Sequence, residues 1–200
     1  MILAPALPRP AHRMRTDVPL AKAYLLLNHG PVTLVSSRSG TRSNVMAASW
    51  AMPLDFDPPK VVAVIDRNTL TRELVDASGE FALSVPPCSL AATVIGVGCV
   101  TGREVDKWSR FGIATLPAAR IAAPLIAGCI GWLECRVLAE RPTAQKYDLF
   151  IAEVVAASAD TRVFSGGRWH FEDEALKTMH YVAGGQFFAI GAPHAVGTGP

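Results

Sequence analysis

One group of residues suited to chemistry lies where a strand gives way to a helix, in the sequence DRNTLTREL. Apolar residues recur at helical spacing over 69–77, so a helix is predicted there with Asn68 or Thr69 as its N-cap. The unpaired N–H groups and the positive dipole end of a helix attract anions. With Arg67 and the hydroxyls of Thr69 and Thr71 nearby, the segment could hold a phosphate. An ordinary capped helix with a solvated arginine would give the same pattern.

A second group lies earlier, in the predicted strand SNVMAASWAM over 43–52. Side chains two residues apart share a face of a strand, which puts Asn44, Ala48 and Trp50 on one face. A small side chain between an amide and a large aromatic ring would let a flat, partly apolar ligand lie close to the strand. The same small residues are also expected of a barrel strand against which a helix packs closely.

The two groups can be neighbours, because a short loop and one apolar strand join them in a hairpin or meander. One would hold a flat ring and the other a phosphate, and this combination suits a mononucleotide such as FMN. The chain has neither a GxGxxG fingerprint nor a Walker A sequence, which argues against a Rossmann-type site.

The elements that must position these residues are mostly strands. Strands are predicted over 32–37, 43–52, 60–66 and 80–85, the first two as a hairpin. Short helices are predicted over 69–77, 89–100 (with Ser89 as N-cap) and 106–113. Two long strands joined by a loop around Pro142 follow, and a short strand is predicted over 187–190. Closely spaced strands with few helices predict a mainly β barrel, because the strand–helix alternation of a doubly wound sheet is missing.

Length and composition limit the class of protein. The chain has 200 residues, half of them hydrophobic, and a formal net charge of +2. It is long enough for one well-filled domain, predicted over 19–200 after an N-terminal tail over 1–18. The charge is too small for the basic surface of a nucleic-acid binder. No membrane-spanning stretch or good signal peptide is visible, so we expect a cytoplasmic protein that needs neither nucleic acid nor membrane.

The cysteines do not suggest a metal site or a disulfide framework. Cys88, Cys99, Cys129 and Cys135 form no CxxC pair, and no histidine lies at metal-ligand spacing from them. Most lie in apolar runs, so buried thiols in a reducing compartment are expected.

The stretch PVTLVSSRSGTRSNVMAASWAMPLDFDPPKVVAVIDRNTLTREL resembles the flavin reductase-like family, whose fold is an FMN-binding split barrel, and is most similar to its flavoredoxin branch. Two later segments support the resemblance. GREVDKWSRFGI is similar to the GR-x-x-DK-aromatic segment of that branch, and MHYVAGGQFFAIG is similar to its C-terminal His and glycine motif. The sequence DFD before the double proline, where shorter flavin reductases have a single Asp, also favours the flavoredoxin type.

The resemblance implies a Greek-key split barrel that is a homodimer, with FMN near the interface between the two copies. It places the flavin ring or ribityl chain against Asn44, Ala48, Ser49 and Trp50. It places the phosphate against Arg67, Asn68, Thr69 and Thr71. Lys107 would reach the flavin, Trp108 could contact it or pack in the core, and His180 could border the site or be structural.

The resemblance also implies an oxidoreductase that passes hydride or electrons through bound FMN, from NADH or NADPH to a small-molecule or protein acceptor. No Ser-His-Asp or Cys-His signature is present, so the flavin would carry the chemistry and no side chain is expected to be catalytic. Lys107 would favour the anionic reduced flavin by its charge. Two alternatives remain: an electron carrier with permanently bound FMN that takes electrons from another reductant, and a non-catalytic module that stores or senses flavin.

Overall fold

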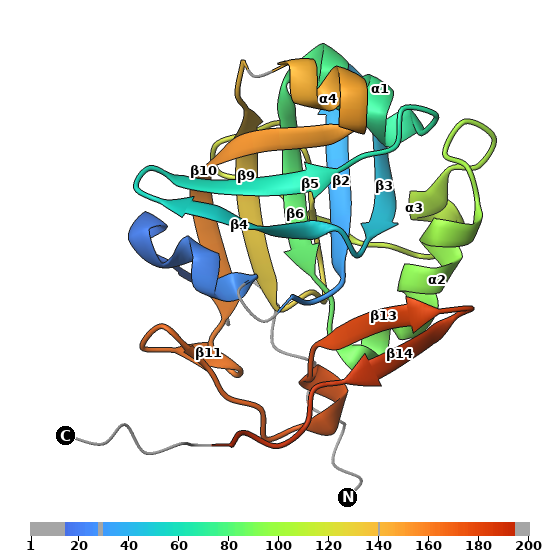
Figure 1. The fold of residues 1–200 in the computed structure, drawn as a ribbon. Coiled ribbons are helices and arrows are strands. Elements are labelled where there is room, and N and C mark those ends of the chain that lie inside the picture. The colour runs from blue at the N-terminus through green and yellow to red at the C-terminus, as the bar shows by residue number, and fades with distance from the viewer. Residues whose placement is uncertain (1–14, 28–29, 140, 195–200) are drawn as a thin grey trace, which may run out of the picture.

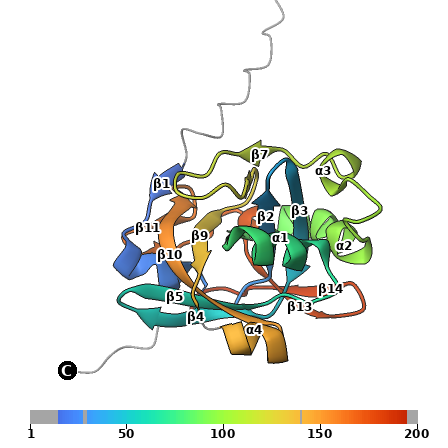
Figure 2. The same cartoon turned by 90° about the horizontal axis from the view of Figure 1, so that it is seen from above.

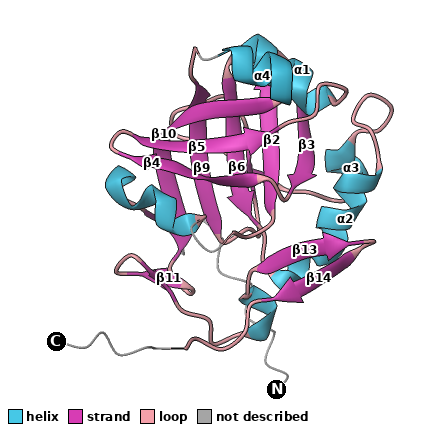
Figure 3. Cartoon of the chain, viewed as in Figure 1, coloured by secondary structure: helices cyan, strands magenta, loops and turns pink. Residues whose placement is uncertain are grey.

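The computed structural model of the chain describes residues 15–27, 30–139 and 141–194. Strands dominate, and the helices are short (Figure 3). Residues 1–14 of the predicted tail lie outside the described residues, whereas Arg15–Asp17 form strand β1 and pair with β10.

One curled antiparallel sheet forms the body of the molecule, with the strand order β3-β2-β6-β9-β10-β5-β4 and with β1 added to β10 (Figure 1). Its strands are β1 (Arg15–Asp17), β2 (Thr33–Ser39), β3 (Arg42–Ala48), β4 (Ala51–Phe56), β5 (Pro59–Val64), β6 (Glu80–Val85), β9 (Gly131–Val137) and β10 (Leu149–Asp160). The long β10 pairs with β1, β9 and β5, so it joins the two halves of the sheet.

Smaller elements surround this sheet. Three short hairpins pair β7 (Thr115–Leu116) with β8 (Leu125–Ile126), β11 (Phe164–Ser165) with β12 (Arg168–Trp169), and β13 (Met179–Ala183) with β14 (Gln186–Ala189). The α-helices are α1 (Leu70–Ser78), α2 (Ala91–Cys99), α3 (Lys107–Arg110) and α4 (Arg141–Tyr147), and the 3-10 turns are η2 (Leu20–Leu26), η3 (Cys88–Leu90) and η4 (Glu174–Leu176).

The central strands are buried on both faces, because a hydrophobic cluster lies on each side of them. Val35 and Phe81 belong to the inner cluster. Their neighbours Leu34 and Ala82 belong to the outer cluster, which includes Val97 of α2. Figure 2 shows α2 and α3 outside the sheet, beyond β3. Successive residues of a strand face opposite sides, so these two clusters account for the nearly continuous apolar runs.

The predicted strand over 43–52 is in fact two strands, and this prediction was wrong. β3 ends at Ala48 and pairs with β2, whereas β4 begins at Ala51 and pairs with β5. The chain therefore crosses from one end of the sheet order to the other at Ser49 and Trp50. The alternation that placed Trp50 on the face of Asn44 stops at this break.

Two smaller predictions need correction. The connection around Pro142 is helix α4 and not a loop. Proline is tolerated there because a first-turn N–H has no helical partner in any case. Ser89 lies inside the 3-10 turn η3, and α2 begins after Leu90 without a side-chain cap. By contrast, the predicted helix after Thr69 is confirmed, with Gly79 at its C-terminal end in the left-handed conformation at φ 71°.

The cysteines differ in their environment. Cys129 and Cys135 are buried as predicted, and burial raises the pKa of both thiols. Cys88 is half-buried, and Cys99 at the end of α2 is exposed, so the prediction was wrong for Cys99. All four are free thiols. Within the described residues, no helix is long and apolar enough to cross a membrane.

Candidate functional site

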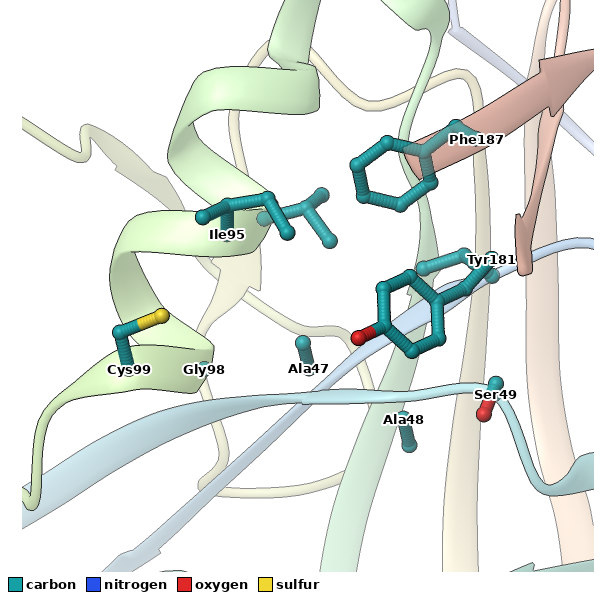
Figure 4. Close-up of a pocket in the computed structure, with 10 residues that line it drawn as sticks. Ala47, Ala48, Ser49, Ile95, Gly98, Cys99, Tyr181 and Phe187 are labelled. Atoms are coloured by element: carbon teal, nitrogen blue, oxygen red, sulfur yellow. The ribbon is translucent and has the colours of Figure 1, made fainter. Parts of the chain in front are cut away.

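Three adjoining hollows meet at Ala47 near the end of β3. The first, which we name the polar groove, has a volume of about 410 Å³ and lies between β3, the start of α1 and the segment after α2. The second, the apolar cavity, has a volume of about 230 Å³ and lies between β3, α2 and the β13–β14 hairpin (Figure 4). The third, the open hollow, has a volume of about 320 Å³ and lies between the β3–β4 break and the end of α4.

Small residues bring α2 close to β3 and so shape the walls of these hollows. A Cβ atom added to Gly98 would lie 3.6 Å from the Cβ of Ala47. Two residues earlier, a Cβ at Gly96 would lie 2.6 Å from the ring of Phe111. The close approach of the helix to Phe111 therefore depends on the absence of a side chain at Gly96, whereas the distance at Gly98 is an ordinary contact.

The start of α1 opens into the polar groove. Thr69 caps the helix: its hydroxyl accepts a hydrogen bond from the N–H of Arg72 at 3.1 Å and donates to the carbonyl of Asp66 at 2.8 Å. Asn68 lines the same groove, and its N–H donates to the carboxylate of Asp66 at 2.7 Å. The first N–H groups of a helix lack helical partners, so this end can bind an anion, although the carboxylate of Asp66 also faces the groove.

Asn44 lies at the floor of the groove and is only 3% exposed. Its side-chain amide donates to the hydroxyl of the fully buried Thr71 at 2.9 Å. Gly102 passes so close that an added Cβ would lie 2.2 Å from the side-chain oxygen of Asn44. The absence of a side chain at Gly102 therefore keeps this amide in place.

Lys107 lines the groove from α3 and is 4% exposed. Its ammonium group donates to the carbonyls of Val45 at 3.0 Å and Val97 at 2.7 Å, which joins β3 to α2. Burial lowers the pKa of Lys107 to about 8. The side chain therefore holds two walls of the site together and adds positive charge to the groove near neutral pH.

Arg67 points away from the polar groove. Its guanidinium donates to the carboxylate of Asp148 at 3.1 Å and to the carbonyl of Gln145 at 3.1 Å. Asp148 also accepts a hydrogen bond from the largely buried Arg72 at 2.9 Å. This network ties α1 to the residues between α4 and β10.

The predicted site residues are thus only partly gathered. Asn44, Asn68, Thr69 and Lys107 line the polar groove. Ala48 and Ser49 line both the apolar cavity and the open hollow, and the 72% exposed Trp50 lines the open hollow. Arg67 and Thr71 line none of the three hollows.

The sequence left two possible roles open for Trp108 and for His180. Trp108 packs against the outer hydrophobic cluster, and its indole N–H donates to the carbonyl of Ser43 at 3.3 Å, as expected of core packing. His180 lies on β13 opposite Phe188, beside Tyr181.

Sequence reasoning missed the wall formed by α2 and the β13–β14 hairpin. Ile95, Gly98 and Cys99 come from α2, and Tyr181 and Phe187 come from the hairpin. Two signals were available. Gly96 and Gly98 indicate close helix packing, and Gly184-Gly185 between two apolar runs indicates a hairpin turn.

The sequence is similar to a known family and to other proteins over most of its length. Residues 26–181 match the family model described as flavin reductase like domain. The uncharacterized protein YddH of Escherichia coli (strain K12) is 40% identical over 177 residues, which span 87% of this chain and 94% of YddH.

Solved structures agree with this match. The FMN-binding domain of a flavin reductases-like enzyme from Shewanella baltica OS155 is 44% identical, with a TM-score of 0.89 over 92% of this chain and 97% of that one. The flavoredoxin of Desulfovibrio vulgaris (Miyazaki F) is 20% identical, with a TM-score of 0.74 over 84% of this chain and 91% of that one, a likeness of fold. The predicted split barrel, mainly β with a few short helices, is thereby confirmed.

Proposed function

Since the chain belongs to the flavin reductase-like family, we propose that it binds FMN and is a flavin-dependent oxidoreductase reduced by NADH or NADPH. The observation that carries the proposal is the meeting of the three hollows at Ala47. A polar groove that can take an anion adjoins an open hollow, lined by Ala48, Ser49 and Trp50, that can take a flat ring. The domain from Shewanella baltica is described as FMN-binding, and the likeness to it supports the proposal.

The side chains that line the hollows fit FMN. Ala47 and Ala48 leave room for a ring against the backbone in the open hollow. The start of α1, with Asn68 and Thr69, offers donors for a phosphate. Arg67 would add charge to this cradle only after leaving Asp148, to which it is hydrogen-bonded.

Bound FMN would supply the hydride and electron transfer, and the chain would supply position, charge and exclusion of water. The amide of Asn44 is held by Thr71 and would orient the ligand from the floor of the groove. The ammonium of Lys107 would favour a negatively charged reduced cofactor. None of these groups needs to accept or donate a proton during the reaction.

An anaerobic titration tests the proposal. The purified protein is mixed with FMN, uptake is followed by quenching of flavin fluorescence, and NADH or NADPH is then added without oxygen. We expect uptake followed by bleaching of the yellow colour. Failure to take up FMN would contradict the whole proposal. Stable yellow colour with both nucleotides would contradict the nicotinamide reductant and favour an electron carrier reduced by another donor.

We also propose that the protein is a homodimer in which two copies meet over β4. Exposed apolar side chains lie along this strand and at the residue just before it. They form the β4 apolar patch: Trp50 (72% exposed), Met52 (53%), Leu54 (48%) and Phe56 (62%). β4 is at the end of the sheet order, and exposed apolar residues on an edge strand favour association. Trp50 belongs to both the patch and the open hollow, so a second copy would lie next to the proposed FMN site.

A further inference from the structure

The apolar cavity differs in chemistry from the polar groove beside it. None of its lining side chains carries a charge, and most are aliphatic or aromatic. The polar side-chain groups are the hydroxyls of Ser49 and Tyr181 and the thiol of Cys99. A charged molecule in this cavity would lose its hydration without gaining a partner of opposite charge, so an uncharged occupant is favoured.

Tyr181 supplies a hydrogen-bond donor to this cavity. Figure 4 shows its hydroxyl directed into the cavity, toward the side of Ala47. Within the described part of the chain, no hydrogen bond to this hydroxyl is formed, and the residue is 43% exposed. The hydroxyl can therefore donate to a ligand without breaking a bond inside the protein.

Phe187 faces the same cavity and lies beside Tyr181, with ring centroids 5.5 Å apart and an interplanar angle of 60°. Aromatic side chains favour flat, polarisable ligands through stacking and edge contacts. The volume of about 230 Å³ is small and admits a single small ring system.

The apolar cavity adjoins the proposed FMN site, so a molecule bound in it could exchange electrons with the flavin. It shares Ala47, Gly98 and Cys99 with the polar groove. A molecule in the cavity would thus lie beside a flavin whose phosphate is held at the start of α1. The end formed by Tyr181 and Phe187 is the end away from that phosphate.

We propose that the apolar cavity binds a small, uncharged quinone as electron acceptor, with the Tyr181 hydroxyl donating a hydrogen bond to a quinone carbonyl. A quinone is flat, carries no charge and offers only acceptors, and so it matches the aromatic walls and the hydroxyl donor. The quinone gains two electrons and one proton, as a hydride, from the negatively charged reduced FMN and a second proton from solvent; it leaves as the hydroquinone, and FMN returns to its oxidised form. This inference rests on the proposed function and names its acceptor.

Equilibrium binding tests the inference without turnover. Duroquinone is titrated calorimetrically into the oxidised, FMN-loaded protein, in which no electron transfer takes place. We expect saturable binding that Tyr181→Phe weakens about fivefold, as loss of one hydrogen bond predicts. FMN affinity should be equal in both proteins. Tyr24→Phe, which removes a hydroxyl on η2 outside the cavity, is the matched control and should bind duroquinone like the wild type.

A second measurement uses the protein with reduced FMN. The FMN is photoreduced, and its reoxidation by duroquinone is measured by anaerobic stopped flow, where Tyr181→Phe should raise the half-saturating quinone concentration by the same factor. Equal duroquinone affinity of wild type and Tyr181→Phe overturns the inference. So does a parallel loss of FMN affinity, which would make Tyr181 a flavin contact, or equally tight binding of a carboxylated analogue. Absence of FMN uptake contradicts the proposed function itself, whereas FMN uptake without duroquinone binding overturns this inference alone.

Discussion

The Lys107 side chain forms hydrogen bonds that join two elements, and it also has a lowered pKa. The contribution of its charge to stability can be measured by varying the pH. Lys107→Met keeps a side chain of similar length but removes the donor to the carbonyls of Val45 and Val97. Burial lowers the pKa of Lys107 from 10.5 to about 8. Between these values the unfolded chain binds more protons than the folded chain, so rising pH favours the folded lysine protein.

We therefore expect the free energy of unfolding of the wild type, relative to Lys107→Met, to increase across this pH interval by about 1–3 kcal/mol. Urea unfolding of both proteins at a series of pH values measures the difference. Comparing the two proteins cancels the titration of groups that they share. A difference that stays constant with pH would show that the amine titrates alike in the folded and unfolded chains.

The absence of a side chain at Gly102 leaves room for the Asn44 side chain. We therefore expect that adding one methyl group at this position weakens FMN binding. In Gly102→Ala the new Cβ would lie 2.2 Å from the Asn44 side-chain oxygen, so the amide must move and lose its bond to Thr71. We expect FMN affinity to fall about five- to thirtyfold, the equivalent of about 1–2 kcal/mol. Fluorescence titration measures it. Gly191→Ala, where a Cβ meets nothing within 4 Å, is the control and should bind FMN normally.

At the residue scale, the sequence indicated which residues have a local role better than it indicated their hydrogen-bond and ion-pair partners. Asn68 or Thr69 was predicted as the cap because capping is local, and the structure shows that the cap is Thr69. The partner of Arg67 is Asp148, 81 residues away in the chain, and no local pattern reveals that ion pair. Thr71, predicted at the phosphate, is the second residue of α1, and its hydroxyl accepts a hydrogen bond from the Asn44 side chain on β3.

At the scale of elements, the packing of α2 predicts opposite outcomes for two nearby glycines. Gly96→Ala would place a Cβ 2.6 Å from the Phe111 ring, whereas Gly98→Ala would make an ordinary contact 3.6 Å from Ala47. Overpacking should destabilise Gly96→Ala by about 1–3 kcal/mol. Gly98→Ala should be neutral or stabilising by up to about 1 kcal/mol, because alanine favours the helix. Thermal and urea unfolding measure both, and equal effects would mean that α2 lies farther from α3 than the structure indicates.

The ion pairs between α1 and the start of β10 predict a pH effect in acid. Burial alone would raise the pKa of Asp148, but the hydrogen bond from Arg72 and the charge of Arg67 outweigh it and hold the pKa below its usual 3.8. The pairs therefore stabilise the fold above that value and are lost as the pH falls through the lowered pKa.

Asp148→Asn keeps a side chain that tolerates the backbone φ of 58° at this position and removes only the charge. We expect the variant to be less stable than the wild type at neutral pH, with the difference shrinking in acid. Unfolding curves over this pH range provide the check. A difference that persists below the pKa of the carboxyl would assign the effect to packing.

The elements themselves were largely predictable because hydrophobic period and turn residues are local signals. β2, β5, β6 and α1 were expected within a few residues of their observed bounds. The break at Ser49 and Trp50 was not, because its cause is the exchange of partners from β2 to β5, a property of the whole sheet. Helix α4 was missed since Pro142 argues for a loop unless it falls in the first turn.

At the scale of the whole molecule, the β4 apolar patch predicts the oligomeric state. Leu54→Lys places a charge in the proposed contact between two copies and should shift the protein toward the monomer. Light scattering coupled to size exclusion measures the mass in solution. Val182→Lys is the matched control, since Val182 is as exposed as Leu54, at 48%, but lies on β13. A monomeric wild type, or equal dissociation by both substitutions, would contradict an interface over β4.

The β13–β14 hairpin forms a two-stranded sheet separate from the main sheet, whereas the groove that would hold the phosphate is built on the main sheet and the helices beside it. The stretch matched by the family model ends at Tyr181, within the first strand of this hairpin, so Phe187 lies beyond it. A change in the length or composition of the hairpin could retune which acceptor is admitted while the cofactor cradle stays intact.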